Sequence, residues 1–177
     1  MSNSPPLTLW RRNLANLPDY PLPPEYRLRL IAPGEVSSWV EVQQAAEPYL
    51  TMSEEWFWQE FGTPKGLAWE RCFLLEESAG PVVGTITAWS DDQLDGRERG
   101  RVHWLAIRPE WQGRGLAKPM VSAALQLLSR HHDSAYLITQ AERTVAIRLY
   151  EAMGFEPYHR PPNKDSTPTD QSTPTTQ

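Results

Sequence analysis

The sequence predicts a single α/β domain built around one mixed β-sheet. The chain has 177 residues, which is the length of one domain with a sizeable core. Its apolar residues follow the two-residue period of strands in some segments and the helical period in others. The predicted order is strand, two helices, three strands, then helix, strand, helix and a short strand. Three consecutive strands followed by a strand–helix–strand unit favour one mixed sheet flanked by helices.

The first half of the chain supplies three strands and two helices. Residues 25–31 alternate polar and apolar, which indicates a strand. Helical patterns follow at 34–47 and at 53–61, the second opening with Ser53 as an N-cap before two glutamates. Strands at 71–77 and 82–90 flank a Gly-Pro turn.

The second half alternates strands and helices. After a polar loop at residues 91–100, a strand at 101–108 ends at a proline. A helix is expected at 116–130, a strand at 135–139 and a helix at 143–153 that ends at a glycine. Residues 155–159 complete the pattern as a short strand.

Proline divides the chain into three parts, with six of the 17 prolines in residues 1–24 and five in 157–177. Residues 161–177 lack the apolar side chains that could offset the entropy of ordering, so we expect a disordered tail. Residues 1–24 carry leucines and aromatic residues, and their prolines oppose a long regular element. We expect a proline-rich arm packed on the domain of residues 25–160, or on a second copy.

Composition excludes several classes of protein. The 17 basic and 22 acidic residues give a formal net charge of −5, which argues against duplex nucleic acid as a partner. No apolar run reaches the roughly 18 residues that span a bilayer, and the N-terminus lacks the pattern of a signal peptide. A single cysteine, Cys72, excludes an internal disulfide and a cysteine-rich metal site. We therefore expect a cytoplasmic protein with no metal, no nucleic acid and no membrane association.

One strand-to-helix turn carries the features of an anion site. Gly113 and Gly115 flank Arg114 just before a helix, so backbone N–H groups can approach a ligand closely at the positive end of the helix dipole. Lys118 adds positive charge. The segment has neither the Gly-Lys-Ser/Thr of a P-loop nor the third glycine of a dinucleotide fingerprint. A glycine-tightened turn without a ligand is the alternative.

Two motifs together resemble the GNAT superfamily of N-acetyltransferases. Residues 112–117, QGRGLA, resemble its Gln/Arg-x-x-Gly-x-Gly/Ala signature, and residues 146–155, AIRLYEAMGF, resemble its helix that carries a tyrosine and ends in Gly-Phe. The resemblance implies a mostly antiparallel mixed sheet with one splayed parallel strand pair. It also implies acetyl-CoA as the cosubstrate and a primary amine as the acceptor, by direct attack in a ternary complex.

The resemblance also implies roles for individual residues. The turn binds the pyrophosphate of acetyl-CoA, the preceding strand end pairs with the pantetheine arm, and one N–H, that of Ile107, polarises the thioester carbonyl. Tyr150 protonates the departing thiolate, unless it is simply a core tyrosine. The implied acetyl-CoA contacts are Leu105, Ala106, Ile107, Gln112, Gly113, Arg114, Gly115, Leu116, Ala117, Thr139 and Arg143.

An amine acceptor requires a general base, because an ammonium group is not a nucleophile. The strand before the turn offers His103, whose ordinary pKa near ~6.5 suits the task. Strict alternation would place His103 on the face of Leu105 and opposite Trp104. A structural histidine in the sheet is the alternative, and Asp91 and Asp92 are weaker candidates for the base.

The sequence departs from the family pattern in two places. Arg143 stands where relatives often carry an asparagine, and it could reach a phosphate or do nothing. Relatives usually have two strands after the last helix, and here the final strand is missing. The acceptor side is then open, or completed by the N-terminal arm or a second subunit, so we expect a homodimer.

The acceptor pocket and the activity itself allow alternatives. The two early helices carry aromatic residues that could form a pocket for a flat or cationic amine, or pack in the core. Their glutamates, Glu54, Glu55 and Glu60, could attract a cation or merely face solvent. Instead of an enzyme, the chain could be an inactive sensor that binds acyl-CoA, or a partner-binding subunit of a larger acetyltransferase. The aromatic residues in question are Tyr49, Trp56, Phe57, Trp58 and Phe61.

Overall fold

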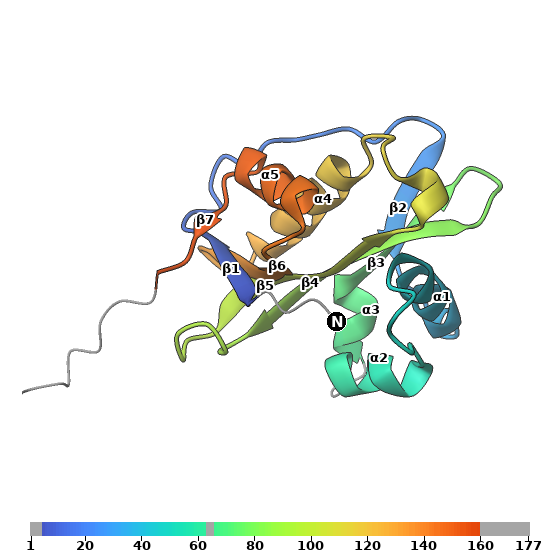
Figure 1. The fold of residues 1–177 in the computed structure, drawn as a ribbon, viewed down its shortest axis with the longest axis horizontal. Coiled ribbons are helices and arrows are strands. Elements are labelled where there is room, and N and C mark those ends of the chain that lie inside the picture. Colours follow the sequence, from blue (N-terminus) through green and yellow to red (C-terminus); the bar gives the residue numbers. More distant parts are fainter. Residues whose placement is uncertain (1–4, 63–65, 160–177) are drawn as a thin grey trace, which may run out of the picture.

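The computed structural model describes residues 5–62 and 66–159, which form one seven-stranded mixed sheet flanked by helices (Figure 1). The strand order is β2-β3-β4-β5-β6-β1-β7. The neighbours β5 and β6 are parallel, and all the other neighbouring strands are antiparallel. The predicted fold class is therefore confirmed. In chain order the elements are β1 (Pro6–Arg11), β2 (Tyr26–Leu30), α1 (Val36–Ala46), α2 (Glu54–Phe61), α3 (Gly66–Arg71), β3 (Cys72–Glu77), β4 (Val82–Asp91), β5 (Arg99–Ile107), a 3-10 turn (Pro109–Trp111), α4 (Ala117–Leu128), β6 (Ala135–Gln140), α5 (Thr144–Ala152) and β7 (Glu156–Pro157).

Helices cover both faces of the sheet and create two cores. Helices α4 and α5 lie on one face, and α1, α2 and α3 lie on the other (Figure 1). The core beneath α4 and α5 includes Leu9 and Leu125, both fully buried. The core beneath α1 to α3 is aromatic: Trp39 packs edge-on against Phe57 and Phe61. The middle of β5 lies between these two cores.

Most predicted elements are confirmed, and one helix was missed. The N-cap at Ser53 is present, because its hydroxyl accepts from the Trp56 N–H at 3.2 Å. The missed helix is α3, whose six residues are too few to show a helical period in the sequence. The strand expected at 101–108 begins two residues earlier, at Arg99.

The N-terminal segment contains a strand of the sheet, which the sequence did not predict. All six residues of β1 pair with β6, and Leu9 and Trp10 also pair with the two residues of β7. The prolines permit this because Pro6 stands at the first position of the strand, where its missing N–H matters least. The strand that the sequence analysis expects to be missing is therefore replaced by β1, which lies between β6 and β7. The expected tail at 161–177 lies outside the described residues.

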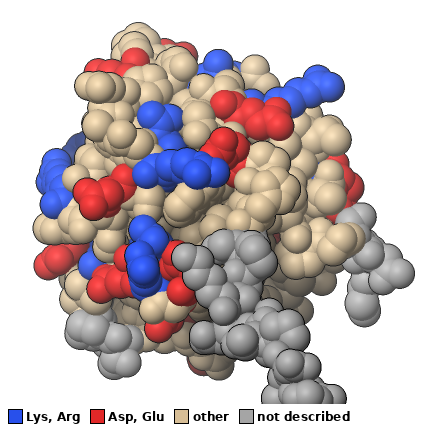
Figure 2. All heavy atoms as spheres, turned by 90° about the vertical axis from the view of Figure 1, so that its left-hand side faces the viewer, with Lys and Arg blue, Asp and Glu red and all other residues tan. Residues whose placement is uncertain are grey.

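Charges of both signs are mixed on the face that shows the β1 and β7 end of the sheet (Figure 2). Arg12, directly after β1, pairs with Glu156 of β7, and about half or more of each side chain is exposed. Exposed pairs of this kind contribute little stability. In the described part of the chain, no helix is both long and apolar enough to cross a membrane.

Candidate active site

The parallel strands β5 and β6 separate soon after they begin. Their pairing covers only Gly100 with Ala135 and Arg101 with Tyr136, although β5 continues to Ile107 and β6 to Gln140. Beyond this point each strand presents backbone groups to the gap instead of to its neighbour. The splay expected from the family resemblance is therefore present, and two cavities lie along it.

A β-bulge at Trp104 accompanies the splay. His103 pairs with Thr87 and Ala106 pairs with Thr85, so two residues of β5 face the single residue Ile86. Trp104 has a φ of 49°, in the left-handed region that tryptophan rarely adopts.

Buried side chains hold the bulge in place. The Trp104 carbonyl accepts from Gln43 Nε2 at 3.0 Å and from the Thr85 hydroxyl at 3.2 Å. Gln43 Nε2 also donates to that hydroxyl at 2.7 Å, and both side chains are almost fully buried. These bonds satisfy the polar groups that the bulge leaves unpaired in the ladder.

The bulge corrects the face predicted for His103. The His103 ring contacts both Phe61 and Trp104, so His103 and Trp104 share the face under α1 and α2. Leu105 packs against the opposite core, under α4 and α5. The expectation that His103 lies opposite Trp104 and beside Leu105 is therefore wrong, because the extra residue interrupts the alternation.

The first cavity, of about 700 Å³, lies between the end of β5, the glycine turn and the start of α5. Gly113 and Gly115 have φ values of 75° and 77°, which non-glycine residues rarely adopt. No atom lies within 4 Å of a Cβ built at either position, so conformation and not crowding requires glycine. Nine of the eleven residues predicted to contact acetyl-CoA line this cavity: Leu105, Ala106, Ile107, Gln112, Gly113, Gly115, Leu116, Ala117 and Arg143.

Backbone N–H groups are available around this cavity. Within the described residues, no backbone carbonyl accepts from the N–H groups of residues 113–116. At the end of β5, the Arg108 N–H donates to the Val83 carbonyl at 2.8 Å. Because successive N–H groups of a strand point in opposite directions, the Ile107 N–H points into the gap towards β6. The Ile107 carbonyl faces the same way and accepts from Gln112 Nε2 at 2.9 Å.

Two predicted contacts lie elsewhere. The Arg114 side chain turns away from the cavity, donating to the Tyr26 hydroxyl at 3.1 Å and to the Glu110 carbonyl at 2.8 Å. Of Arg114, only the backbone N–H is therefore available to a ligand in the turn. The direction of its side chain could not be read from the sequence. Thr139 lines the second cavity instead of the first.

The second cavity, of about 260 Å³, contains both predicted catalytic residues. His103 reaches it from β5 and Tyr150 from α5, although the two are 47 positions apart in the sequence. Leu105 and Arg143 line both cavities, so the two spaces meet at these residues.

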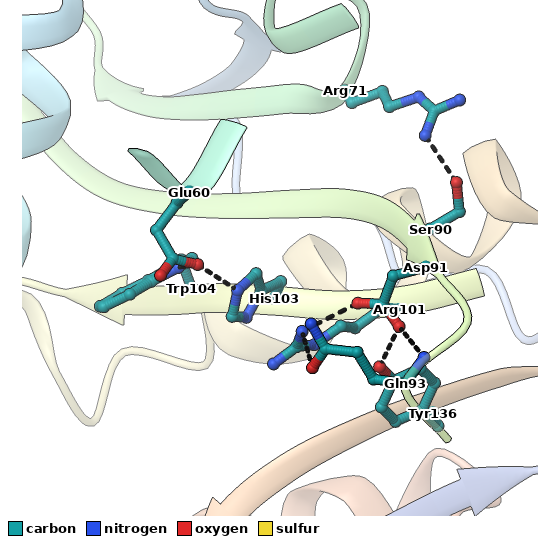
Figure 3. A network of polar contacts seen from close by, with 9 residues as sticks. All are labelled: Glu60, Arg71, Ser90, Asp91, Gln93, Arg101, His103, Trp104 and Tyr136. Carbon is teal, nitrogen blue, oxygen red and sulfur yellow. Dashed lines mark hydrogen bonds and ion pairs between the residues drawn. The ribbon is translucent and has the colours of Figure 1, made fainter. Parts of the chain in front are cut away.

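His103 is held by a carboxylate from α2, the helix that covers its face of the sheet. Its Nε2 lies 3.0 Å from Glu60 Oε2, and Trp104 Nε1 donates to the same oxygen at 3.2 Å (Figure 3). Burial lowers the pKa of His103 below its usual value, and the hydrogen bond that its Nε2 donates to Glu60 opposes this only in part. The imidazole is therefore neutral near pH 7 and able to accept a proton.

Tyr150 is 8% exposed and stands in the core under α5. Burial raises its pKa to about 12, while the nearby charge of Arg143 lowers it slightly. The phenol therefore keeps its proton at neutral pH. Tyr150 belongs to the core and also lines the second cavity, so its position is compatible with either of the two roles expected from the sequence.

Arg143 lies at the junction of the two cavities and forms an ion pair with Glu47, which follows α1. The pair links the helix layers on the two faces of the sheet across the gap between β5 and β6. Neither partner could be paired from the sequence, because 96 positions separate them.

Asp91 is engaged in a separate network. Its carboxylate accepts from Tyr136 and, at 2.9 Å, from Arg101 (Figure 3). Burial opposes ionisation, but these hydrogen bonds hold the pKa of Asp91 below its usual range. The carboxylate ties together the ends of β4, β5 and β6, so we assign it to structure and not to proton abstraction.

The aromatic residues of the early helices are mostly core. Phe57 and Phe61 are fully buried around Trp39, which favours packing over an acceptor pocket. Tyr49 is 97% exposed. Glu60 is the functional candidate that sequence reasoning undervalued, since its contact with His103 spans 43 positions. Among the described residues, no group of three or more His, Cys, Asp or Glu side chains could hold a metal ion.

Comparisons with known proteins agree on one family. The model of the family described as "Acetyltransferase (GNAT) family" matches residues 36–155. A mycothiol acetyltransferase from Thermobispora bispora is 31% identical over 156 residues, covering 83% of this chain and 53% of that protein. The chain therefore spans about half the length of this curated relative.

Solved structures show the same fold. A GCN5-related N-acetyltransferase from Sphaerobacter thermophilus has a TM-score of 0.73 at 21% identity, over 87% of this chain and 48% of that one. The NatC complex bound to Gag peptide and CoA has a TM-score of 0.58 at 23% identity, over 75% of this chain and 85% of that one.

Proposed function

Because the chain belongs to the GNAT family of acetyltransferases, we propose that it transfers an acetyl group from acetyl-CoA to a primary amine. The observation that carries this proposal is the meeting of two cavities between β5 and β6. One has the glycine turn and the other has a neutral histidine and a protonated tyrosine. Reactants bound in the two cavities would be held in contact, which removes much of the entropic barrier.

Acetyl-CoA fits the first cavity. Its pyrophosphate would accept from the free N–H groups of residues 113–116 at the N-terminus of α4. Its pantetheine amides would pair with the end of β5, where β6 has moved away. The Ile107 N–H would then donate to the thioester carbonyl and stabilise the oxyanion of the tetrahedral intermediate.

Transfer would proceed by direct attack. His103 takes a proton from the bound ammonium, and the freed lone pair of the amine attacks the thioester carbon. The intermediate collapses as the carbon–sulfur bond breaks, and Tyr150 protonates the leaving thiolate. The nitrogen of the new amide gives up its extra proton to solvent, and the phenolate of Tyr150 takes a proton back from solvent. Because burial raises the pKa of Tyr150 to about 12, above that of a thiol near ~8.5, the phenolate left behind is the stronger base and is reprotonated at neutral pH. Cys72 is fully buried in the other core, so a covalent acetyl-cysteine is not part of this route.

The similar proteins suggest two classes of acceptor, a small molecule and a peptide. One is a mycothiol acetyltransferase, and another is the NatC complex bound to Gag peptide and CoA. A small amine suits this chain better, because the second cavity measures about 260 Å³ and the Glu47–Arg143 pair crosses its edge. An adjoining hollow, lined by β1 residues including Thr8 and sharing Ile138, offers room for the remainder of the acceptor.

Thermal unfolding with and without acetyl-CoA tests the proposal. At about 100 times Kd, binding adds roughly 2.7 kcal/mol, or several degrees of Tm for a chain of this size. Gly113→Glu is the control, because it places a strained side chain and a negative charge where the pyrophosphate would bind. A rise in Tm on adding acetyl-CoA to the original protein, absent in Gly113→Glu, supports the site. The same change in Tm in both proteins contradicts it.

Release of free thiol from acetyl-CoA then separates an enzyme from a sensor. Amines related to mycothiol and N-terminal peptides are the two panels to compare. A protein that binds acetyl-CoA but releases no thiol with any amine would be the sensor instead. A stable complex with another protein would favour the subunit alternative.

We also expect a cytoplasmic location, where acetyl-CoA is made and used.

A homodimer is the remaining expectation. Because β1 occupies the position beside β6, a second copy would have to pair with one of the two edge strands of the sheet, β2 or β7. Sedimentation equilibrium distinguishes monomer from dimer.

A further inference from the structure

A carboxylate on α2 contacts the histidine that the proposed reaction uses as its base. Glu60 Oε2 lies 3.0 Å from His103 Nε2 and 3.2 Å from the donating Trp104 Nε1. Figure 3 shows Glu60 descending from α2 onto these two neighbouring side chains of β5. The His103 side chain is 17% exposed and that of Glu60 is 34% exposed.

This contact fixes which nitrogen of the imidazole carries the proton. The hydrogen bond from His103 holds the pKa of Glu60 below its usual value, against the effect of burial, so Glu60 is ionised at neutral pH. An ionised carboxylate only accepts hydrogen bonds, so a neutral imidazole must present a protonated Nε2 to it. The Nδ1 lone pair is then left free to take a proton.

The bulge in β5 makes the contact possible. In a regular strand, His103 and Trp104 would point to opposite faces, and one carboxylate could not reach both. The left-handed conformation at Trp104 brings both side chains under α2. The burial of Phe57 and Phe61 against Trp39 fixes the height of α2 above the strand. Rare backbone conformations of this kind concentrate at functional sites.

We infer that Glu60 is a positioning residue, which orients His103 and fixes its tautomer so that Nδ1 acts as the general base for the amine. This inference rests on the proposed function. It adds to that function a residue from α2, a helix that contributes no residue to either of the two cavities described above.

The other charges around His103 set the direction of the expected pH effect. Arg101 on β5 lowers its pKa, whereas Glu60 on α2 and Asp91 on β4 raise it. Glu47 and Arg143 line the same cavity but are paired with each other. Replacing Glu60 by glutamine removes one of the raising charges, so the pKa of His103 should fall further.

The kinetic experiment is a double-mutant cycle on Glu60→Gln and His103→Ala, measured as kcat/KM for thiol release from pH 5 to 9. His103→Ala is expected to lose about 100-fold, within the usual range for a general base. Glu60→Gln is expected to lose about tenfold, because its amide can donate to Nε2 and stabilise the tautomer that lacks a free Nδ1. Its acidic limb should also move to lower pH.

In the His103→Ala background, Glu60→Gln should change kcat/KM less than about twofold, because a positioning residue acts only through its partner. If the loss in the double variant equals the product of the two single losses, the inference is overturned. It is also overturned if the acidic limb of the pH profile does not move in Glu60→Gln. Glu70→Gln is the matched control, the same change at an exposed position of α3 in the same helix layer, and it should leave both readouts unchanged.

A second measurement does not depend on turnover. Nitrogen-15 NMR of the unmodified protein reports the tautomer of His103 directly, and titration gives its pKa with and without Glu60→Gln. A protonated Nε2 and a lower pKa in the variant support the inference. A protonated Nδ1 overturns it, even if Glu60→Gln proves too unstable for kinetics. If the protein releases no thiol with any amine, the proposed function fails, whereas the tautomer still reports on the pair itself.

Discussion

Replacing Thr85 by valine isolates the hydrogen bonds that hold the bulge at Trp104. The Thr85 side chain is fully buried, and its hydroxyl accepts from Gln43 and donates to the Trp104 carbonyl. Valine keeps the shape and suits a strand, so the change removes two hydrogen bonds with little effect on packing. At roughly 1 kcal/mol net for each bond, Thr85→Val should lower the free energy of unfolding by about 2 kcal/mol.

Thr87→Val is a closely matched control. Thr87 lies on the same strand and face as Thr85 and is also fully buried, but its hydroxyl donates to Cys72 Sγ at 3.4 Å. A thiol sulfur is a weak acceptor, so the loss should stay below about 1 kcal/mol. A chain of this size loses about 2–4 °C of Tm per kcal/mol, so calorimetry should show a fall of about 4–8 °C for Thr85→Val. Equal shifts in the two variants would refute the reasoning.

The same pair of variants tests whether the bulge serves the chemistry. The bulge places His103 under α2 and next to the second cavity, so its relaxation should lower kcat in Thr85→Val more than in Thr87→Val. The assay is thiol release at saturating acetyl-CoA, at a temperature well below both Tm values. An unchanged kcat in a destabilised Thr85→Val protein would separate the bulge from catalysis.

Two further predictions address the proton donor and the acid sensitivity of the fold. Tyr150→Phe should lower kcat at least about tenfold while calorimetric titration gives an unchanged Kd for acetyl-CoA, because only the donated proton is lost; full activity would remove Tyr150 from the mechanism. The two hydrogen bonds from Arg29 hold the pKa of Glu35 below its usual value, so the pair contributes stability above pH ~4.5 that is lost as the pH falls through the lowered pKa. Glu35→Gln should therefore cost about 1 kcal/mol in urea unfolding at pH 7, and this cost should shrink steadily as the pH is lowered below ~4.5; a pH-independent difference would contradict this assignment.

The sequence predicted the parts of the fold that depend on local patterns. Alternation located the strands that form most of the sheet, and Ser53 located the start of α2, because both signals lie within a few neighbouring residues. The glycines of the turn also indicated positive φ values, since only glycine adopts them readily. The placement of most predicted acetyl-CoA contacts around one cavity follows from that turn.

Features that depend on distant segments could not be read in this way. The bulge at Trp104 is held by Gln43, about sixty positions earlier in the sequence, so nothing near Trp104 signals the reversed faces of β5. The direction of the Arg114 side chain depends on Tyr26. The pairing of Glu60 with His103 requires the packing of α2 on the sheet before it can be seen.

The position of β1 imposes an order on folding. β1 pairs along its whole length with β6, from which it is separated by more than a hundred residues. A ribosome would expose β1 long before its partner exists, so this strand must wait, unpaired, until β6 has been synthesised. Closing so long a loop is entropically costly, and contacts of this range slow the folding of small domains. This segment is made before the strands that it joins but can take its place only after them, and its prolines can keep it from pairing wrongly in the meantime.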